Sequence, residues 1–273
     1  MNLVLIRAHA KINLTLDVLS RRADGYHEID SVMQTISLHD TVTVKAADGI
    51  TVFCDADEIN TTDNIVFKAA KAFFAAAGIT GGAYIKIKKR IPISAGLGGG
   101  SADAAAVIRG LDRIYETDFS CEALKEIGLA VGADVPFCIT GGTARVGGIG
   151  EKTESLPHLR KYGVVLVKNS KKDSTADMYK RIDALPPAAP LTEKFAGLLS
   201  GGNICFENTG NAFLPLFKDT AALDAIKETG PLCATLSGSG PTFFGVYPDR
   251  SAAEDAADLL KDKGYSPLTA EFE

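Results

Sequence analysis

The sequence lacks the features of a membrane-spanning, secreted or nucleic-acid-binding protein. No uninterrupted apolar run approaches the roughly 20 residues that a membrane-spanning helix needs. The apolar run at the start is too short for the hydrophobic region of a secretory signal, and no small-residue cleavage site precedes Arg7 and Lys11. Basic residues are outnumbered, with 29 Lys plus Arg against 34 Asp plus Glu and a net charge of −5. This balance argues against a main role in binding nucleic acid or an anionic membrane. Any anionic ligand must therefore be bound by a local group of residues.

Cysteine and histidine are sparse, and neither has the spacing of a structural site. The five cysteines are an odd number, widely separated and without a Cys-x-x-Cys pair, so a zinc ribbon and a disulfide framework are both excluded. The four histidines show no His-x-x-x-His spacing, and we expect no dedicated transition-metal site. Together with the missing signal, this predicts a reduced, cytoplasmic protein.

What is present is the composition of an ordinary globular protein. The chain has 273 residues, of which 46% are hydrophobic and 23% charged, which excludes disorder and allows one large domain or two smaller ones. The pattern changes after residue 155, where a continuous apolar strand at 162–168 precedes a segment with three prolines at 183–191. We therefore place a domain boundary near residue 157, with domains at 1–157 and 158–273.

Hydrophobic periodicity predicts a mixture of strands and helices. Alternating apolar and polar residues predict strands, and recurrences three and four residues apart predict helices. The helix that begins at Asp63 or Asn64 should end at Gly78, a residue suited to a helix C-cap. The expected strands are 3–6, 12–18, 41–46, 83–93, 162–168 and 242–247, and the other expected helices are 101–115, about 120–131 and about 251–263.

Four of the 27 glycines, Gly96, Gly98, Gly99 and Gly100, gather in one loop between a predicted strand and a predicted helix. Successive glycines let backbone N–H groups converge on an anion, and the start of the following helix completes such a site. The loop is not a Walker A sequence, a Gly-x-Gly-x-x-Gly fingerprint or a Gly-x-Ser-x-Gly nucleophile elbow. A phosphate cradle is the favoured interpretation over a flexible turn with a serine cap. Its residues are Pro92, Ile93, Ser94, Ala95, Gly96, Leu97, Gly98, Gly99, Gly100, Ser101 and Ala102.

Several segments together resemble the GHMP kinase superfamily. They are AKINLTLDVLSRRADGYHEIDSVMQTISLHD at 10–40, PISAGLGGGSADAA at 92–105, GADVPF at 132–137, GGTARVGGIGE at 141–151 and SGSGPT at 237–242. The resemblance implies an α+β fold of two domains, the first like ribosomal protein S5 domain 2 and the second ferredoxin-like, with the active site between them. It also implies ATP-dependent phosphorylation of the 2-hydroxyl of 4-diphosphocytidyl-2-C-methyl-D-erythritol, a step of non-mevalonate isoprenoid synthesis, with Mg²⁺ arriving on the nucleotide.

The resemblance assigns the proton chemistry to Asp134 and Lys11. Asp134 would accept the proton of the substrate hydroxyl, although its place before Val135 and Pro136 also suits a helix cap. Lys11 would stabilise the ionised Asp134 and a developing alkoxide, although lysines on strands are more often edge gatekeepers. Asn13 lies two residues further along the same predicted strand and therefore faces the same side as Lys11.

The resemblance also assigns a subsite for the cytosine base. Tyr26 and His27 would hold it by ring stacking and a hydrogen bond to its edge, although a Tyr-His pair after a turn is otherwise most often a packed hairpin. Tyr179 would form the other aromatic face, with Thr175 nearby. The 237–242 turn is expected beside the glycine loop, whereas the glycines at 141–150 are expected to serve hairpin turns.

Two other functions compete with this hypothesis. Another GHMP kinase, acting on homoserine or mevalonate, would share the glycine loop but would need no base-stacking pair. A non-catalytic nucleotide-binding regulator would have no use for both Lys11 and Asp134. We therefore expect a small-molecule substrate, and neither nucleic acid nor membrane, as the partner.

Overall fold

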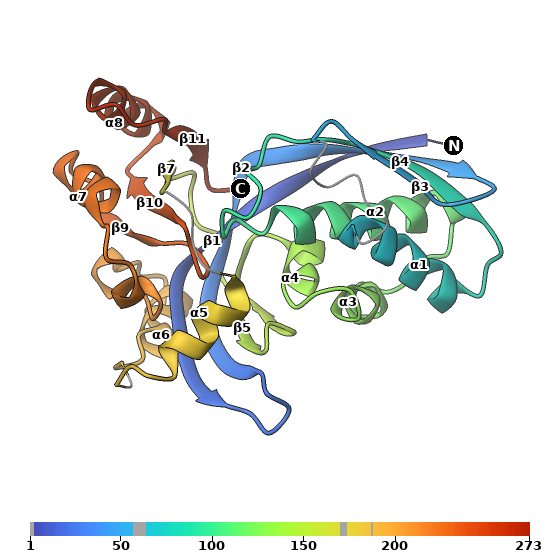
Figure 1. Ribbon diagram of the computed structural model, residues 1–273, viewed down its shortest axis with the longest axis horizontal. Coiled ribbons are helices and arrows are strands. Elements are labelled where there is room, and N and C mark those ends of the chain that lie inside the picture. Colours follow the sequence, from blue (N-terminus) through green and yellow to red (C-terminus); the bar gives the residue numbers. More distant parts are fainter. Residues whose placement is uncertain (1–2, 57–63, 170–173, 187) are drawn as a thin grey trace. The chain divides into compact units, whose positions relative to one another are not determined.

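The computed structural model describes residues 3–56, 64–169, 174–186 and 188–273 (Figure 1). The chain forms two compact units, each built from separate stretches of sequence. Unit 1 comprises Met1–Ala10, Leu38–Ile93 and Gly98–Gly141, and unit 2 comprises Lys11–Ser37, Ser94–Leu97 and Gly142–Glu273. Because these units interleave along the chain, they do not test a boundary at residue 157, which stays a prediction.

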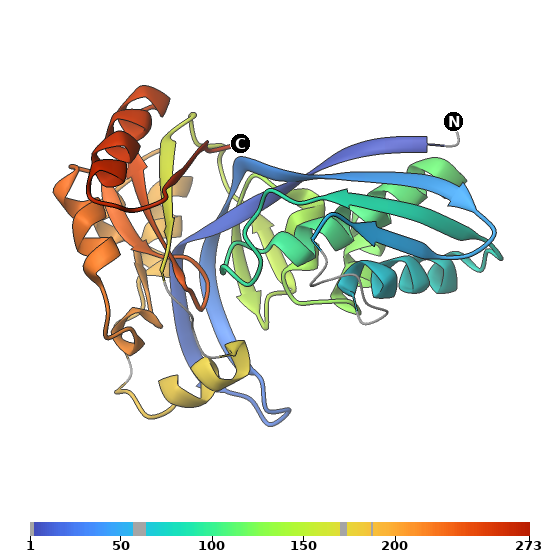
Figure 2. The same cartoon turned by 45° about the horizontal axis from the view of Figure 1, so that its top comes forward.

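Two long neighbouring strands, β1 (Leu3–Arg21) and β2 (His27–Ala47), run through both units (Figure 2). The strands expected at 3–6 and 12–18 are therefore parts of one strand, and the strand expected at 41–46 is the end of β2. The turn between them is closed by hydrogen bonds from Arg22 N to Tyr26 O and from Gly25 N to Arg22 O. Gly25 takes a φ of 89° there, a left-handed conformation that glycine adopts without strain.

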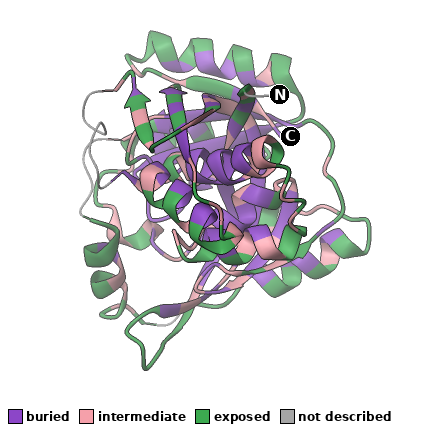
Figure 3. Ribbon diagram, turned by 90° about the vertical axis from the view of Figure 1, so that its right-hand side faces the viewer, coloured by how far each residue is buried: buried purple, intermediate pink, exposed green. Residues whose placement is uncertain are grey.

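Unit 1 packs helices against strands. Its strand β4 (Gly82–Lys88) pairs antiparallel with the end of β2 and parallel with β3 (Thr51–Cys54). The helices are α1 (Ile65–Ala77), α2 (Gly99–Tyr115), α3 (Cys121–Leu129) and α4 (Val135–Thr140). In Figure 3, buried and exposed residues alternate along the helices, as expected when one side of a helix packs on a core.

The helix expected from residue 63 or 64 is confirmed by α1. Asn64 caps its start by accepting a hydrogen bond from Val66 N, and Gly78 ends it with a φ of 63°. The strand expected at 83–93 is too long, because β4 ends at Lys88. Beyond it, the N–H groups of Arg90 and Ile91 bind the carboxylate of Asp40 instead of a neighbouring strand.

Unit 2 contains a four-stranded sheet in the order β11–β7–β10–β9, with every neighbouring pair antiparallel. Helices α7 (Ala221–Glu228) and α8 (Arg250–Asp262) lie on the same side of this sheet (Figure 1). The strands are β7 (Gly163–Lys168), β9 (Cys233–Leu236), β10 (Thr242–Tyr247) and β11 (Leu268–Glu271). The continuous apolar run predicted as a strand is β7, whose Val164 and Val165 are fully buried.

The remaining elements in the described part of unit 2 are three strands, two helices and two short 3₁₀ turns. They are β5 (Thr143–Gly148), β6 (Lys152–Ser155), β8 (Gly210–Asn211), α5 (Thr175–Ile182), α6 (Thr192–Ser200) and the short 3₁₀ turns Phe206–Asn208 and Leu214–Leu216. β5 pairs with β2 and with β6, and β8 pairs with β1. The expected α+β class is confirmed. None of the helices in the described ranges has the length and apolarity needed to cross a membrane.

Candidate active site

Lys11 and Asn13 lie side by side on β1 in unit 2. Lys11 is 4% exposed and Asn13 1% exposed, and Lys11 Nζ donates a hydrogen bond to Asn13 Oδ1 at 2.9 Å. The expectation that the two residues face one side is confirmed. A gatekeeper lysine at a strand edge would be exposed to solvent, so the burial of Lys11 argues against that alternative.

The glycine loop contacts this strand and the 237–242 turn within unit 2. Lys11 N donates to Leu97 O at 3.0 Å, and Ser237 Oγ donates to Gly96 O at 3.0 Å. Gly96 has a φ of 78°, and a Cβ built on it would lie 2.4 Å from Ser237 O. Only glycine fits this approach, so the packing expected between the turn and the loop is confirmed.

Asn13 and Asn211 hold the 237–242 turn in place. Asn13 Oδ1 accepts a hydrogen bond from Gly238 N at 2.9 Å. Asn211 Nδ2 donates to Leu236 O at 2.8 Å and to Gly238 O at 2.9 Å. Thr175, the first residue of α5, meets the same turn through a 3.3 Å contact between its Oγ1 and Ser239 Oγ. The structure thus brings Lys11, Asn13, Thr175 and part of the glycine loop around one turn.

A second group in unit 2 joins His27 to α5. The rings of His27 and Tyr179 stack, with centroids 4.9 Å apart and planes inclined by 28°. His27 Nε2 lies 2.6 Å from Asp183 Oδ1, and Phe213 meets Tyr179 edge-on. Tyr179 and Asp183 are four residues apart, so they project from one side of the helix.

Tyr26 is not part of this aromatic group. It lies in the β1–β2 turn and is 60% exposed, and no ring contact joins it to Tyr179 among the described residues. His27 instead covers one face of Tyr179. The structure therefore brings together His27 and Tyr179 but leaves Tyr26 apart from them.

The rest of the glycine loop forms the start of α2 in unit 1. The helix begins at Gly99, two residues earlier than expected, and its N-cap Gly98 has a φ of 70° and no capping side chain. The first turn carries no acidic residue. The first backbone N–H groups of a helix have no partner within it and carry partial positive charge, so this turn suits an anion.

Asp134 lies on the connector between α3 and α4, as expected. It occupies the N-cap position of α4, but its side chain makes no capping hydrogen bond to that helix. Ile65 links the connector to the start of α2, because its side chain would lie 3.4 Å from a Cβ on Gly100 and 3.4 Å from one on Gly132. Gly132 on this connector and Gly100 at the start of α2 therefore both lie near Ile65, and the side chain of Asp134 gives no support for the capping alternative.

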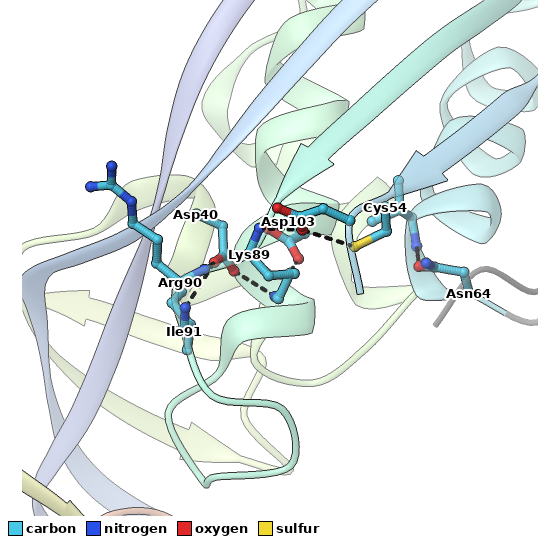
Figure 4. A network of polar contacts seen from close by, with 9 residues as sticks. Asp40, Cys54, Asn64, Lys89, Arg90, Ile91 and Asp103 are labelled. Atoms are coloured by element: carbon cyan, nitrogen blue, oxygen red, sulfur yellow. Dashed lines mark hydrogen bonds and ion pairs between the residues drawn. The ribbon is translucent and has the colours of Figure 1, made fainter. Parts of the chain in front are cut away.

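A buried ion network lies beside the start of α2 in unit 1 (Figure 4). Lys89 Nζ contacts Asp40 Oδ2 and lies 2.8 Å from Asp103 Oδ2. Burial raises the pKa of Asp103 to about 7, against the opposing charge of Lys89 and with a further rise from Asp40. Burial lowers the pKa of Lys89, but Asp103 and Asp40 outweigh it and the net direction is upward. Asp103 Oδ1 is buried and has no hydrogen-bond partner among the described residues.

Sequence reasoning missed Asp183, Asn211, Lys89 and the role of Asp103. His27 and Asp183 are 156 residues apart, and Asn211 and Gly238 are 27 apart, so no local pattern joins them. Asp103 alone carried a signal, since it is an acidic residue in a helix otherwise rich in alanine next to the glycine loop.

Comparison with known proteins defines the class. The family described as GHMP kinases N terminal domain matches residues 64–142, and the family described as GHMP kinases C terminal matches residues 200–266. The first match includes the start of α2 and Asp134, and the second includes Asn211 and the 237–242 turn. The fold and these matches define a GHMP kinase, a class that uses ATP as the phosphoryl donor.

Relatives define the particular family. A protein of Carboxydothermus hydrogenoformans named 4-diphosphocytidyl-2-C-methyl-D-erythritol kinase is 43% identical, over 92% of this chain and 91% of the relative. One of the same name from Desulfitobacterium hafniense is 36% identical, over 97% and 94%. A crystal structure of 4-(cytidine 5'-diphospho)-2C-methyl-D-erythritol kinase aligns with a TM-score of 0.82 at 29% identity, over 98% of this chain and 99% of that one. The chain belongs to the 4-diphosphocytidyl-2-C-methyl-D-erythritol kinase family.

The pKa of Asp103 gives a prediction about stability. Burial raises the pKa of Asp103 to about 7 in the folded protein, against an ordinary value of 3.8. The folded state therefore binds this proton more tightly than the unfolded chain does, and the stability contributed by Asp103 is lost as pH rises through that interval. Asp103→Asn removes this loss. In urea unfolding, the free energy of unfolding of the variant relative to the wild type should increase between pH 4.5 and 7.5, by on the order of a few kcal/mol. A difference that does not change with pH would contradict the raised pKa of Asp103.

Proposed function

We propose that this protein transfers the γ-phosphoryl group of ATP to the 2-hydroxyl of 4-diphosphocytidyl-2-C-methyl-D-erythritol, in the non-mevalonate route to isoprenoid precursors. The products are ADP and the 2-phosphate of the substrate. The observation that carries the phosphoryl-transfer chemistry is the buried Lys11, whose own N–H binds Leu97 of the glycine loop. A cation is thereby held against the loop suited to the phosphates. The names and extent of the relatives support the substrate.

The glycine loop, residues 92–102, is proposed to hold the phosphates of ATP. Main-chain N–H groups at the start of α2 would bind the phosphate oxygens, and the absence of an acidic residue in that turn supports this role. Gly96 and the 237–242 turn fix the preceding part of the loop. A chain with a net charge of −5 can bind a triphosphate in this way because the binding groups are local dipoles.

Asp134 and Lys11 are proposed to act on the acceptor hydroxyl. Asp134 would accept its proton as the hydroxyl oxygen bonds to the γ-phosphorus and the bond to ADP breaks. Lys11 would stabilise the negative charge that develops on that oxygen. Asn13 supports this role, since its amide oxygen fixes the ammonium of Lys11 without adding a charge.

His27, Tyr179, Tyr26 and Thr175 are proposed to bind the cytidylyl part of the substrate. Tyr179 offers an aromatic ring for the base, and the contact of His27 with Asp183 fixes the imidazole against one face of that ring. Tyr26 is exposed in the adjoining turn and could stack on a base only when the substrate is bound. A homoserine or mevalonate kinase would need none of these groups.

Mg²⁺ is proposed to arrive with ATP. Within the described ranges, no group of three or more His, Cys, Asp or Glu side chains is placed to hold a metal ion. We expect the ion to be held mainly by phosphate oxygens and water, as is common for Mg²⁺. When bound, the ion would offset the negative charge of the phosphates.

The reduced cytoplasm is the proposed location. All five cysteines lie in the described part of the chain, where none of them forms a disulfide and two are buried. Thiols in this state suit a reducing compartment.

A substrate panel tests the proposed function. The purified protein should form ADP from ATP with the cytidylyl substrate and magnesium, and should not do so when either is left out. Homoserine and mevalonate serve as matched acceptors. ADP formation with one of them, and none with the cytidylyl substrate, would overturn the proposal.

Asp134→Asn tests the proton acceptor. The amide keeps the shape but cannot take the proton, so kcat should fall by roughly 10²-fold or more while ATP binding is retained. Asp258→Asn, which breaks an exposed ion pair on α8, is the control and should keep the wild-type kcat. An unchanged kcat in Asp134→Asn would leave Asp134 without a chemical role.

Tyr179→Ala tests the base subsite. Loss of the ring should raise KM for the cytidylyl substrate roughly tenfold, as expected for a stacked base, and leave KM for ATP unchanged. Tyr179→Phe keeps the ring and should restore most of the affinity. Equal weakening of both substrates in Tyr179→Ala would place this aromatic side chain outside the base subsite.

A further inference from the structure

The two ends of the glycine loop are joined by a buried ion pair. Lys89 comes three residues before the loop, and Asp103 follows its last residue, Ala102. Lys89 Nζ lies 2.8 Å from Asp103 Oδ2, both in unit 1 (Figure 4). The pair therefore closes the segment that is proposed to hold the phosphates.

Asp40 anchors the chain where it enters the loop. Its side chain is fully buried, and one carboxylate oxygen accepts hydrogen bonds from the N–H groups of Arg90 and Ile91 while the other meets Lys89 (Figure 4). The Lys89 side chain is 10% exposed and that of Asp103 only 2%. Because water is largely excluded, these contacts hold their partners more firmly than a surface ion pair would.

The first residue of α2 packs directly on this anchored segment. A Cβ built on Gly99 would lie 3.0 Å from Ile91 Cγ2 and 3.4 Å from Lys89 Nζ. The start of the helix is thus fixed from two directions, by contact at Gly99 and by the ion pair at Asp103. Its N–H groups are the ones that a phosphate would meet.

We propose that Asp103 and Lys89 are positioning residues for the phosphoryl donor, which shape the glycine loop before ATP binds. The inference rests on the proposed use of this loop for ATP. A loop that is already closed loses less conformational freedom when its ligand arrives, so affinity for that ligand rises. Neither side chain needs to touch the nucleotide for this effect.

Asp103→Ala removes the contact between residue 103 and Lys89, here called the tether, and keeps Lys89 paired with Asp40. KM for ATP should rise about tenfold or more, and KM for the cytidylyl substrate should stay within about twofold. Asp103→Asn retains an oxygen that accepts from Lys89 Nζ and should bring KM for ATP back to within about threefold of the wild type. Asp258→Asn on α8 is the matched surface control, with both KM values unchanged.

A role in fold stability alone predicts another pattern. Asp103→Ala would then lower kcat per mole of protein, through a smaller folded fraction, without moving KM for ATP, and this result would overturn the proposal. Equal loss of ATP affinity in Asp103→Asn and Asp103→Ala would also overturn it, because charge rather than the tether would then matter. If Asp103→Ala does not fold, Asp103→Ser replaces it, since a serine hydroxyl is one bond too short to reach Lys89.

Failure of the proposed function is recognised separately. A wild-type protein that forms no ADP from ATP would overturn the kinase assignment. A wild-type protein that does, combined with an unchanged KM for ATP in Asp103→Ala, would overturn only the positioning role. In direct titrations with ATP and no second substrate, the affinity for ATP should decrease in the order wild type, Asp103→Asn, Asp103→Ala.

Discussion

The buried ammonium group of Lys89 holds together the residues on either side of the glycine loop. It joins Asp40 in β2 to Asp103 in α2, and both carboxylates are withdrawn from solvent. A chain with a net charge of −5 has no overall excess of positive charge to attract a triphosphate, so the proposed binding relies on main-chain N–H groups at one helix end. Such dipoles are effective only when their directions are fixed, which explains why so costly a buried network is retained beside the loop.

The two buried lysines have different surroundings. Lys89 is held by two carboxylates, which offset its charge. Lys11 donates a hydrogen bond to the amide oxygen of Asn13, which helps to position its ammonium group. The same amide oxygen binds Gly238 N, so one side chain orients both the cation and the turn that supports Gly96. These contacts agree with the roles proposed above, in which Lys89 shapes the glycine loop and Lys11 stabilises charge on the acceptor oxygen.

Local patterns predicted most of the secondary structure and the parts of the site that lie in continuous motifs. The helix from Asn64 to Gly78 and the strand at 163–168 follow from periodicity and caps. The strand expected at 83–93 was too long because Asp40, about fifty residues away, takes the N–H groups of Arg90 and Ile91. The stacking of His27 on Tyr179 and the contact with Asp183 were likewise beyond local patterns.

The sequence by itself determined the α+β class, the glycine loop and the kinase family, because glycine spacing, periodicity and motifs are written in neighbouring residues. Only the tertiary structure decided which buried groups hold that loop: Lys89 with Asp103, Asn13 and Asn211 with the 237–242 turn, and Asp183 with His27. The physical reason is that a buried polar group must find its partner wherever the fold supplies one. That partner can lie at any distance along the chain.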